Sequence, residues 1–132
     1  MNNFQIRIPR KQSAFGRPVR WRKIKELVLG KKYALSVALV ADKEMRRAEN
    51  MARHKKHANV LSFAYEKNSG EILLNVSYIR RETRILKQPL KERLVYLYIH
   101  SLLHLKGHDH KKPKDERKML REEKRYMIKS GF

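Results

Sequence analysis

The sequence predicts an α+β fold in which a small sheet packs against helices. Apolar, β-branched runs with the length of strands lie at 33–40, 59–65 and 71–76. Apolar residues recur at helical spacing in three other segments, 21–29, 89–104 and 115–129. The chain has 132 residues, of which 41% are hydrophobic, so we expect one domain over residues 1–132 with one packed core.

Local signals set the element boundaries in the first half of the chain. Residues 4–8 alternate between apolar and polar side chains, which predicts a first strand. Gly30 is expected to end the helical segment that precedes it. After the second strand, Asp42 is expected to cap a helix that runs to Met51.

The second half begins with a cationic connector, residues 53–58 (RHKKHA). Turn-forming residues at 67–70 (KNSG) separate the next two strands, which predicts a hairpin with antiparallel pairing. Gly107 is expected to end the long helix. The final helical segment, 115–129, is rich in charge and keeps an apolar side.

The charge of the chain is extreme, because 33 Lys and Arg residues against 13 Asp and Glu residues give a net charge of +20. Such an excess favours a polyanionic partner, most commonly a nucleic acid. The alternative is an adaptation for solubility. Charge of this kind supplies affinity without specifying a sequence or a reaction.

Cysteine is absent, so any metal must be held by His, Asp or Glu, and no disulfide can form. No apolar stretch approaches the roughly 20 residues that span a bilayer. The N-terminus carries no apolar segment typical of a secretory signal. We therefore expect a cytoplasmic protein without a membrane partner.

Four of the six histidines fall within the segment HSLLHLKGHDH, residues 100–110. His100 and His104 are one helical turn apart, so both imidazoles project from one face. Gly107 allows the chain to turn back, and His110 can then supply a third ligand. Three protein ligands leave one position open, as in a catalytic zinc site. We predict one zinc ion per chain, held by these three histidines; imidazole also suits copper, nickel and iron.

Two neighbours of the ligands have alternative roles. His108 follows the glycine break, so we place it at the rim of the site rather than among the ligands. Asp109 either orients a ligand imidazole or is a solvated carboxylate in a local turn.

The spacing His-x-x-x-His-x-x-Gly-x-x-His is also that of metzincin proteases, which place a glutamate directly after the first histidine as general base. This chain has Ser101 at that position. A serine cannot take up the proton at neutral pH without a base of its own. Peptidase activity is therefore disfavoured.

The histidine segment resembles the signature of the YbeY family, H-G-x-L-H-L-x-G-Y-D-H. Ser101 replaces the usual Gly of that pattern, and His108 replaces the usual Tyr. The segment 59–65 (NVLSFAY) is similar to the family's T-[DN]-V-L-S-F-P strand. An alignment that starts from Asp42 places Arg53 on the arginine of the family's Y-R pair.

The resemblance implies a four-stranded mixed sheet packed against helices, with the zinc site at the end of the long helix. It also implies single-strand-specific, metal-dependent cleavage of RNA, in 16S ribosomal RNA 3′-end maturation and ribosome quality control. Single-stranded RNA and ribosomal particles would be the partners, and no small-molecule cofactor is expected.

Within this hypothesis, Arg53 would clamp a phosphate and stabilise charge in the transition state. His54 and His57 could transfer protons, although a surface role is the alternative. The cationic residues 53–56 and three downstream arginines are candidates for phosphate contacts, namely Arg80, Arg81 and Arg84.

Two other function classes compete with the endoribonuclease. One is a non-catalytic ribosome-binding factor in which zinc serves mainly structure, which would suit the charge of +20. The other is a metzincin-like metalloprotease, which Ser101 disfavours.

Overall fold

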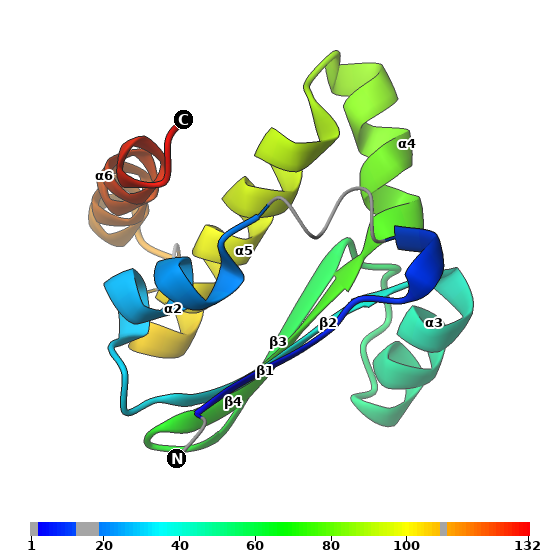
Figure 1. The fold of residues 1–132 in the computed structure, drawn as a ribbon, viewed down its shortest axis with the longest axis horizontal. Helices are drawn as coiled ribbons and strands as arrows, with labels where there is room; N and C mark the ends of the chain where they lie inside the picture. The colour runs from blue at the N-terminus through cyan, green and yellow to red at the C-terminus, as the bar shows by residue number, and fades with distance from the viewer. Residues whose placement is uncertain (1–2, 13–18, 109–110) are drawn as a thin grey trace.

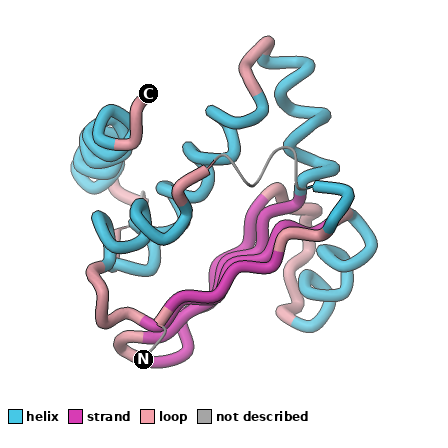
Figure 2. Tube along the Cα trace, in the orientation of Figure 1, coloured by secondary structure: helices cyan, strands magenta, loops and turns pink. Residues whose placement is uncertain are grey.

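The computed structural model describes residues 3–12, 19–108 and 111–132. Within these residues, four strands form one mixed sheet in the order β1-β2-β4-β3. The strands are β1 (Phe4–Arg7), β2 (Ala34–Val40), β3 (Val60–Glu66) and β4 (Ser69–Asn75). β1 and β4 each pair parallel with β2, whereas β3 pairs antiparallel with β4. Figure 2 shows the strands lying side by side as one twisted layer. The predicted mixed sheet and its antiparallel hairpin are confirmed.

Five α-helices and one short 3-10 helix accompany the sheet in the described residues. They are η1 (Arg10–Gln12), α2 (Trp21–Leu29), α3 (Asp42–Met51), α4 (Val76–Leu86), α5 (Leu90–Lys106) and α6 (Pro113–Lys129). No helix of the described residues is long and apolar enough to cross a membrane.

The helices cover the two faces of the sheet unequally, with α3 on one face and α2 and α5 on the other (Figure 1). In the larger core cluster, apolar side chains of α2 and α5 pack against every second residue of the central strands, for example Leu35, Val37 and Ile72. The intervening residues Ala38 and Leu73 belong to a smaller cluster beneath α3. The central strands are thus buried on both faces, as parallel pairing usually requires.

Helix α5 is the centre of the larger cluster, where it packs against α2, α6 and the sheet. The Tyr98 hydroxyl on α5 donates a hydrogen bond to the Trp21 carbonyl of α2 (2.9 Å), and the two rings meet edge to face. α5 ends at Gly107, whose φ of 114° turns the chain out of the helix. This stop confirms the role expected for that glycine.

Helix α4 is absent from the sequence prediction, which placed Val76 at the end of a strand. Asn75 instead ends β4 and caps the helix, since its side chain accepts a hydrogen bond from the Tyr78 backbone N–H (3.1 Å). The prediction that Asp42 caps α3 is also wrong. Ala41 occupies the cap position, and Asp42 is the first helical residue, where its negative charge favours the helix N-terminus.

Candidate metal centre

His100 and His104 lie on one face of α5, as their spacing predicts. Their Nε2 atoms point towards each other and are 3.1 Å apart, and the rings meet edge to face. The side chain of His100 is 26% exposed, so the pair opens to solvent at one side of the helix. The structure therefore brings together two of the three predicted ligands.

The Nδ1 atom of each ring has its own partner, and the two Nε2 atoms face each other. His100 Nδ1 lies 2.5 Å from Oε2 of Glu123, a carboxylate of α6 whose side chain is 4% exposed. His104 Nδ1 lies 3.1 Å from the backbone oxygen of His108. Both partners are acceptors, so each Nδ1 carries the proton and donates it. In the neutral imidazoles, each Nε2 then presents a lone pair.

Gly107 makes the second of these contacts possible. Its left-handed conformation lets the His108 backbone N–H donate to the Leu103 carbonyl (2.9 Å). That bond folds the chain back over the last turn of α5, so the His108 carbonyl reaches the ring of His104. His108 thus acts on the site through its backbone, which fits its placement at the rim.

Glu123 is held in place by a second contact and is missing from the sequence prediction. Its Oε1 atom accepts a hydrogen bond from the Tyr96 hydroxyl (3.2 Å). One signal in the sequence points to this residue. Met119 and Tyr126 form the buried side of α6, and Glu123 is the carboxylate between them on that side. A buried carboxylate in an apolar stripe needs a polar partner, and His100 supplies it.

The pair of histidines fits a zinc ion by its geometry. Two nitrogens that bind one tetrahedral zinc at about 2.0–2.1 Å each lie roughly 3.3 Å apart. The observed 3.1 Å separation is close to this value. Two lone pairs at that distance repel each other unless a proton or a cation lies between them. The carboxylate–histidine contact at Glu123 is the outer contact that zinc-binding histidines usually have.

His110 and Asp109 lie outside the described residues. Among the residues that are described, no group of three His, Cys, Asp or Glu side chains is arranged to hold a metal. The described part of the site is therefore the pair His100 and His104 with Glu123 and the His108 carbonyl. Ser101, at the position of the protease glutamate, is 2% exposed and belongs to the packed interior of α5.

Arg53 follows α3 and is exposed, with a left-handed φ of 55° that is uncommon outside glycine. Its backbone N–H donates to the Asn50 carbonyl (3.1 Å). Helix α3 covers the face of the sheet opposite to α5 (Figure 1). No contact in the described residues joins Arg53 to His100 or His104.

His57 belongs to a second cluster of charged groups that sequence reasoning did not foresee. Its Nδ1 lies 3.0 Å from Oε2 of Glu49, and its Nε2 lies 3.0 Å from Oδ1 of Asp42. The hydrogen bonds to Glu49 and Asp42 raise the pKa of His57 and outweigh the opposing effect of burial. The His57 ring, which belongs to the connector before β3, thus contacts a carboxylate near each end of α3.

Arg81 of α4 completes this cluster by binding Asp42 through two hydrogen bonds, 3.0 and 3.1 Å long. These bonds hold the pKa of the Asp42 carboxyl well below its usual range, with further help from Asn75 and His57. Arg81 is therefore an ion-pair partner of α3 in this structure rather than an open phosphate contact. His54, in contrast, is exposed, and its Nδ1 lies 2.6 Å from the Lys56 carbonyl oxygen.

Comparison with known proteins identifies the family of the chain and agrees with its architecture. The family model described as "Endoribonuclease YbeY" matches residues 5–131. The protein named Endoribonuclease YbeY in Pelagibacter ubique is 32% identical over 126 residues, which cover 89% of this chain and 82% of the relative. The protein of that name in Lacticaseibacillus casei is 30% identical and covers 82% of this chain and 80% of its own length.

A solution structure of a Thermotoga maritima protein has the same fold, with a TM-score of 0.65 at 24% sequence identity. The match covers 92% of this chain and 86% of that protein. The family model spans nearly the whole chain, including helix α5 with His100 and His104. The chain belongs to the YbeY endoribonuclease family of metal-dependent RNA hydrolases.

Proposed function

We propose that the protein is a zinc-dependent endoribonuclease that cleaves single-stranded RNA, acting in 16S ribosomal RNA 3′-end maturation and ribosome quality control. One observation carries the metal part of the proposal. His100 and His104 present their Nε2 atoms to one position, while Glu123 and the His108 carbonyl hold the opposite nitrogens. Family membership and the net charge of +20 support RNA as the substrate.

One zinc ion per chain would be held by His100, His104 and His110. When bound with an open position, zinc polarises a phosphoryl oxygen or lowers the pKa of a water ligand towards 7. The chain itself contributes the orientation of the rings. Glu123 keeps the proton on Nδ1 of His100, and the His108 carbonyl does the same for His104, so both Nε2 lone pairs stay aimed at the ion.

Arg53 is proposed as a phosphate contact for the same RNA. Its left-handed backbone is a strained conformation for a side chain with a Cβ, and such strain gathers at functional sites. Its guanidinium is exposed and offers a bidentate surface to a phosphate. In this role Arg53 would clamp the phosphate and stabilise charge that develops in the transition state.

The substrate class also defines the partners and the location. Ribosomal particles that carry 16S RNA precursors would bind the protein in the cytoplasm, and the strong positive charge would speed their association at low salt. No small-molecule cofactor is part of this proposal.

The test of the proposal is cleavage of a labelled single-stranded RNA by purified protein. We expect cleavage that stops with a chelator, returns with zinc and is lost in His104→Ala. Gln5→Ala is the control, because Gln5 is a neutral, exposed residue of β1. Equal cleavage by His104→Ala and the unchanged protein would exclude the metal mechanism. Ribosome binding without turnover would instead support the non-catalytic factor.

The role of Arg53 has a separate test. Arg53→Ala is expected to lower kcat/KM for the RNA, whereas Arg47→Ala, on the exposed side of α3, is expected to leave it unchanged. An unchanged kcat/KM in Arg53→Ala would remove the phosphate contact from the proposal and leave the metal centre unaffected.

A further inference from the structure

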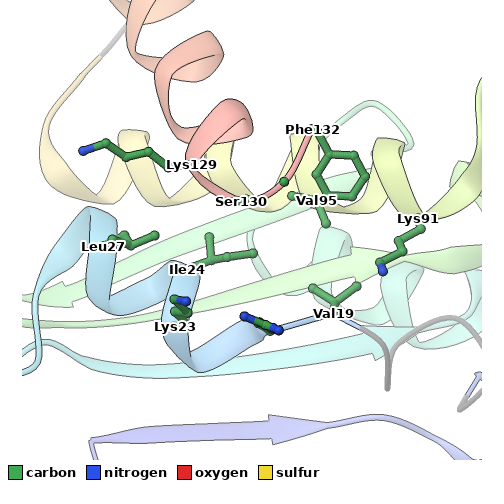
Figure 3. Close-up of a pocket in the computed structure, with 11 residues that line it drawn as sticks. Val19, Lys23, Ile24, Leu27, Lys91, Val95, Lys129, Ser130 and Phe132 are labelled. Carbon is green, nitrogen blue, oxygen red and sulfur yellow. The ribbon is translucent and has the colours of Figure 1, made fainter.

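A pocket of about 460 Å³ lies between α2, the first half of α5 and the end of α6. Its apolar lining includes Ile24 of α2, Val95 of α5 and Phe132. Figure 3 shows Ile24 and Val95 in the middle of the pocket and the ring of Phe132 towards one end. Phe132 is 44% exposed, so part of an aromatic surface faces the pocket and solvent.

The lining also includes four cationic side chains, those of Arg20, Lys23, Lys91 and Lys129. No Asp or Glu side chain of the described residues lines the pocket. Lys129 has a cation–π contact with Tyr126, 5.7 Å from the ring centroid. Arg20, Lys23 and Lys91 are exposed and make no ion pair or side-chain hydrogen bond with any described residue. An anionic ligand could therefore take up these charges without displacing an internal partner.

This pocket is separate from the metal centre. Val95 and His100 are five residues apart, which places them about 140° apart around α5. Tyr96 and Glu123, which support His100, do not line the pocket. The two sites share α6, along which Glu123 and Lys129 are separated by about 9 Å of helix axis.

We propose that this pocket binds one nucleotide of a single-stranded RNA. The base lies against Phe132 and the apolar lining, and the phosphates lie among Arg20, Lys23 and Lys91. Proteins that bind single-stranded nucleic acid without sequence preference combine an aromatic surface, on which bases stack, with cations that contact the phosphates. The inference rests on the proposed function for its choice of RNA, and it adds an anchoring site away from the metal centre.

The test measures binding of a fluorescent single-stranded RNA by anisotropy, with chelator present so that cleavage does not interfere. Lys23→Glu/Lys91→Glu is compared with Lys43→Glu/Arg47→Glu, two exposed positions on α3. Both pairs lower the net charge by four, from +20 to +16. We expect Lys23→Glu/Lys91→Glu, the pocket pair, to weaken RNA binding at least tenfold and to reduce the salt dependence of the RNA affinity. We expect Lys43→Glu/Arg47→Glu, the α3 pair, to weaken RNA binding less than threefold.

Phe132 tests the base contact. We expect Phe132→Ala to weaken RNA binding roughly tenfold, because base stacking needs an aromatic ring. Phe132→Tyr keeps the ring and is expected to bind the RNA as the unchanged protein does. Equal losses in the two charge pairs, or unchanged binding in Phe132→Ala, would overturn the proposal. Displacement of the RNA by AMP at equal phosphate concentration would also overturn it, since it would assign the pocket to a free nucleotide.

Cleavage of the same RNA with and without chelator separates this inference from the proposed function. If cleavage proves independent of metal while the pocket pair still loses binding, the anchoring site stands without the endonuclease mechanism. If cleavage is chelator-sensitive and the pocket pair binds normally, the endonuclease proposal stands without the anchor.

Discussion

Nδ1 of His100 donates to the Glu123 carboxylate across 2.5 Å, and the two residues are 23 positions apart in the chain. The contact ties α6 to the face of α5 that carries His100 and His104. Because Glu123 is nearly buried and also accepts a hydrogen bond from Tyr96, the carboxylate that orients the His100 ring is itself held in place. The orientation of His100 in the candidate metal centre therefore depends on α6, which contributes none of the predicted ligands.

Glu123→Gln is expected to weaken zinc binding by roughly 10–100-fold, because a neutral amide holds the imidazole less firmly and lowers its basicity. Zinc affinity can be measured by competition with a chromophoric chelator. Glu122→Gln is the matched control, since Glu122 pairs with Arg125 on the outer side of α6. Equal affinities for the Glu123 and Glu122 variants would show that the carboxylate does not support the metal.

Gly107→Ala is expected to destabilise the fold by about 1 kcal/mol, because a Cβ is strained at a φ of 114°. The same change should weaken zinc binding, since the left-handed turn brings the His108 carbonyl to His104. Melting temperature and zinc affinity are the two measurements.

Gly131→Ala is the control for this backbone effect. Gly131 also has a left-handed φ, 96°, and an added Cβ would meet no atom within 4 Å at either glycine. We expect both variants to lose stability and only Gly107→Ala to lose zinc affinity. A parallel loss of affinity in Gly131→Ala would mean that the effect on zinc comes from lower stability alone.

The sequence predicts the parts of this molecule that local patterns encode. β2 and β3 follow from β-branched runs, and the pair His100 and His104 follows from helical spacing. The pairing of Glu123 with His100 could not be predicted, because the two residues are distant in sequence and only the packing of α6 on α5 brings them together. Helix α4 was missed for a different reason. The apolar residues of β4 run on into Val76, so the sequence pattern does not show where the strand ends. Without that boundary, Asn75 cannot be recognised as the cap of α4.

His57 should make stability depend on pH in a defined direction. Its pKa is raised in the folded protein by Glu49 and Asp42, so its contribution is complete below its unfolded pKa of about 6.5 and is lost as pH rises through the folded value. The pKa of Asp42 is lowered, so that carboxylate contributes above about pH 4 and loses its contribution as pH falls. We therefore expect the cluster to stabilise most between about pH 5 and 6.5.

Thermal melts from pH 5 to pH 9 check this expectation by comparing the unchanged protein with His57→Gln. The difference in melting temperature should be largest near pH 5.5 and should shrink as the unchanged protein loses the His57 proton. His54→Gln, in the same connector, should follow the unchanged protein at every pH. A difference that stays constant across this range would assign the role of His57 to packing rather than to charge.

Gly70 is required where the β3–β4 hairpin meets the end of α5. A Cβ at this position would lie 2.6 Å from the Tyr33 hydroxyl, 2.8 Å from the Phe63 carbonyl oxygen and 3.2 Å from Leu105, the neighbour of His104. We expect Gly70→Ala to lower the free energy of unfolding by about 1–3 kcal/mol, because such overpacking forces backbone to move. Denaturant titration measures the loss.

Tyr33→Phe separates the two clashes at Gly70. The Tyr33 hydroxyl is buried without a hydrogen-bond partner among the described residues, so its removal should be neutral or stabilising by up to about 1 kcal/mol. In Tyr33→Phe/Gly70→Ala the contact with the hydroxyl is gone, while the clash with the β3 backbone remains. The double variant should therefore recover part of the loss, with a coupling of about 0.5–3 kcal/mol between the two positions. Strict additivity would instead place the whole cost of Gly70→Ala on the β3 backbone.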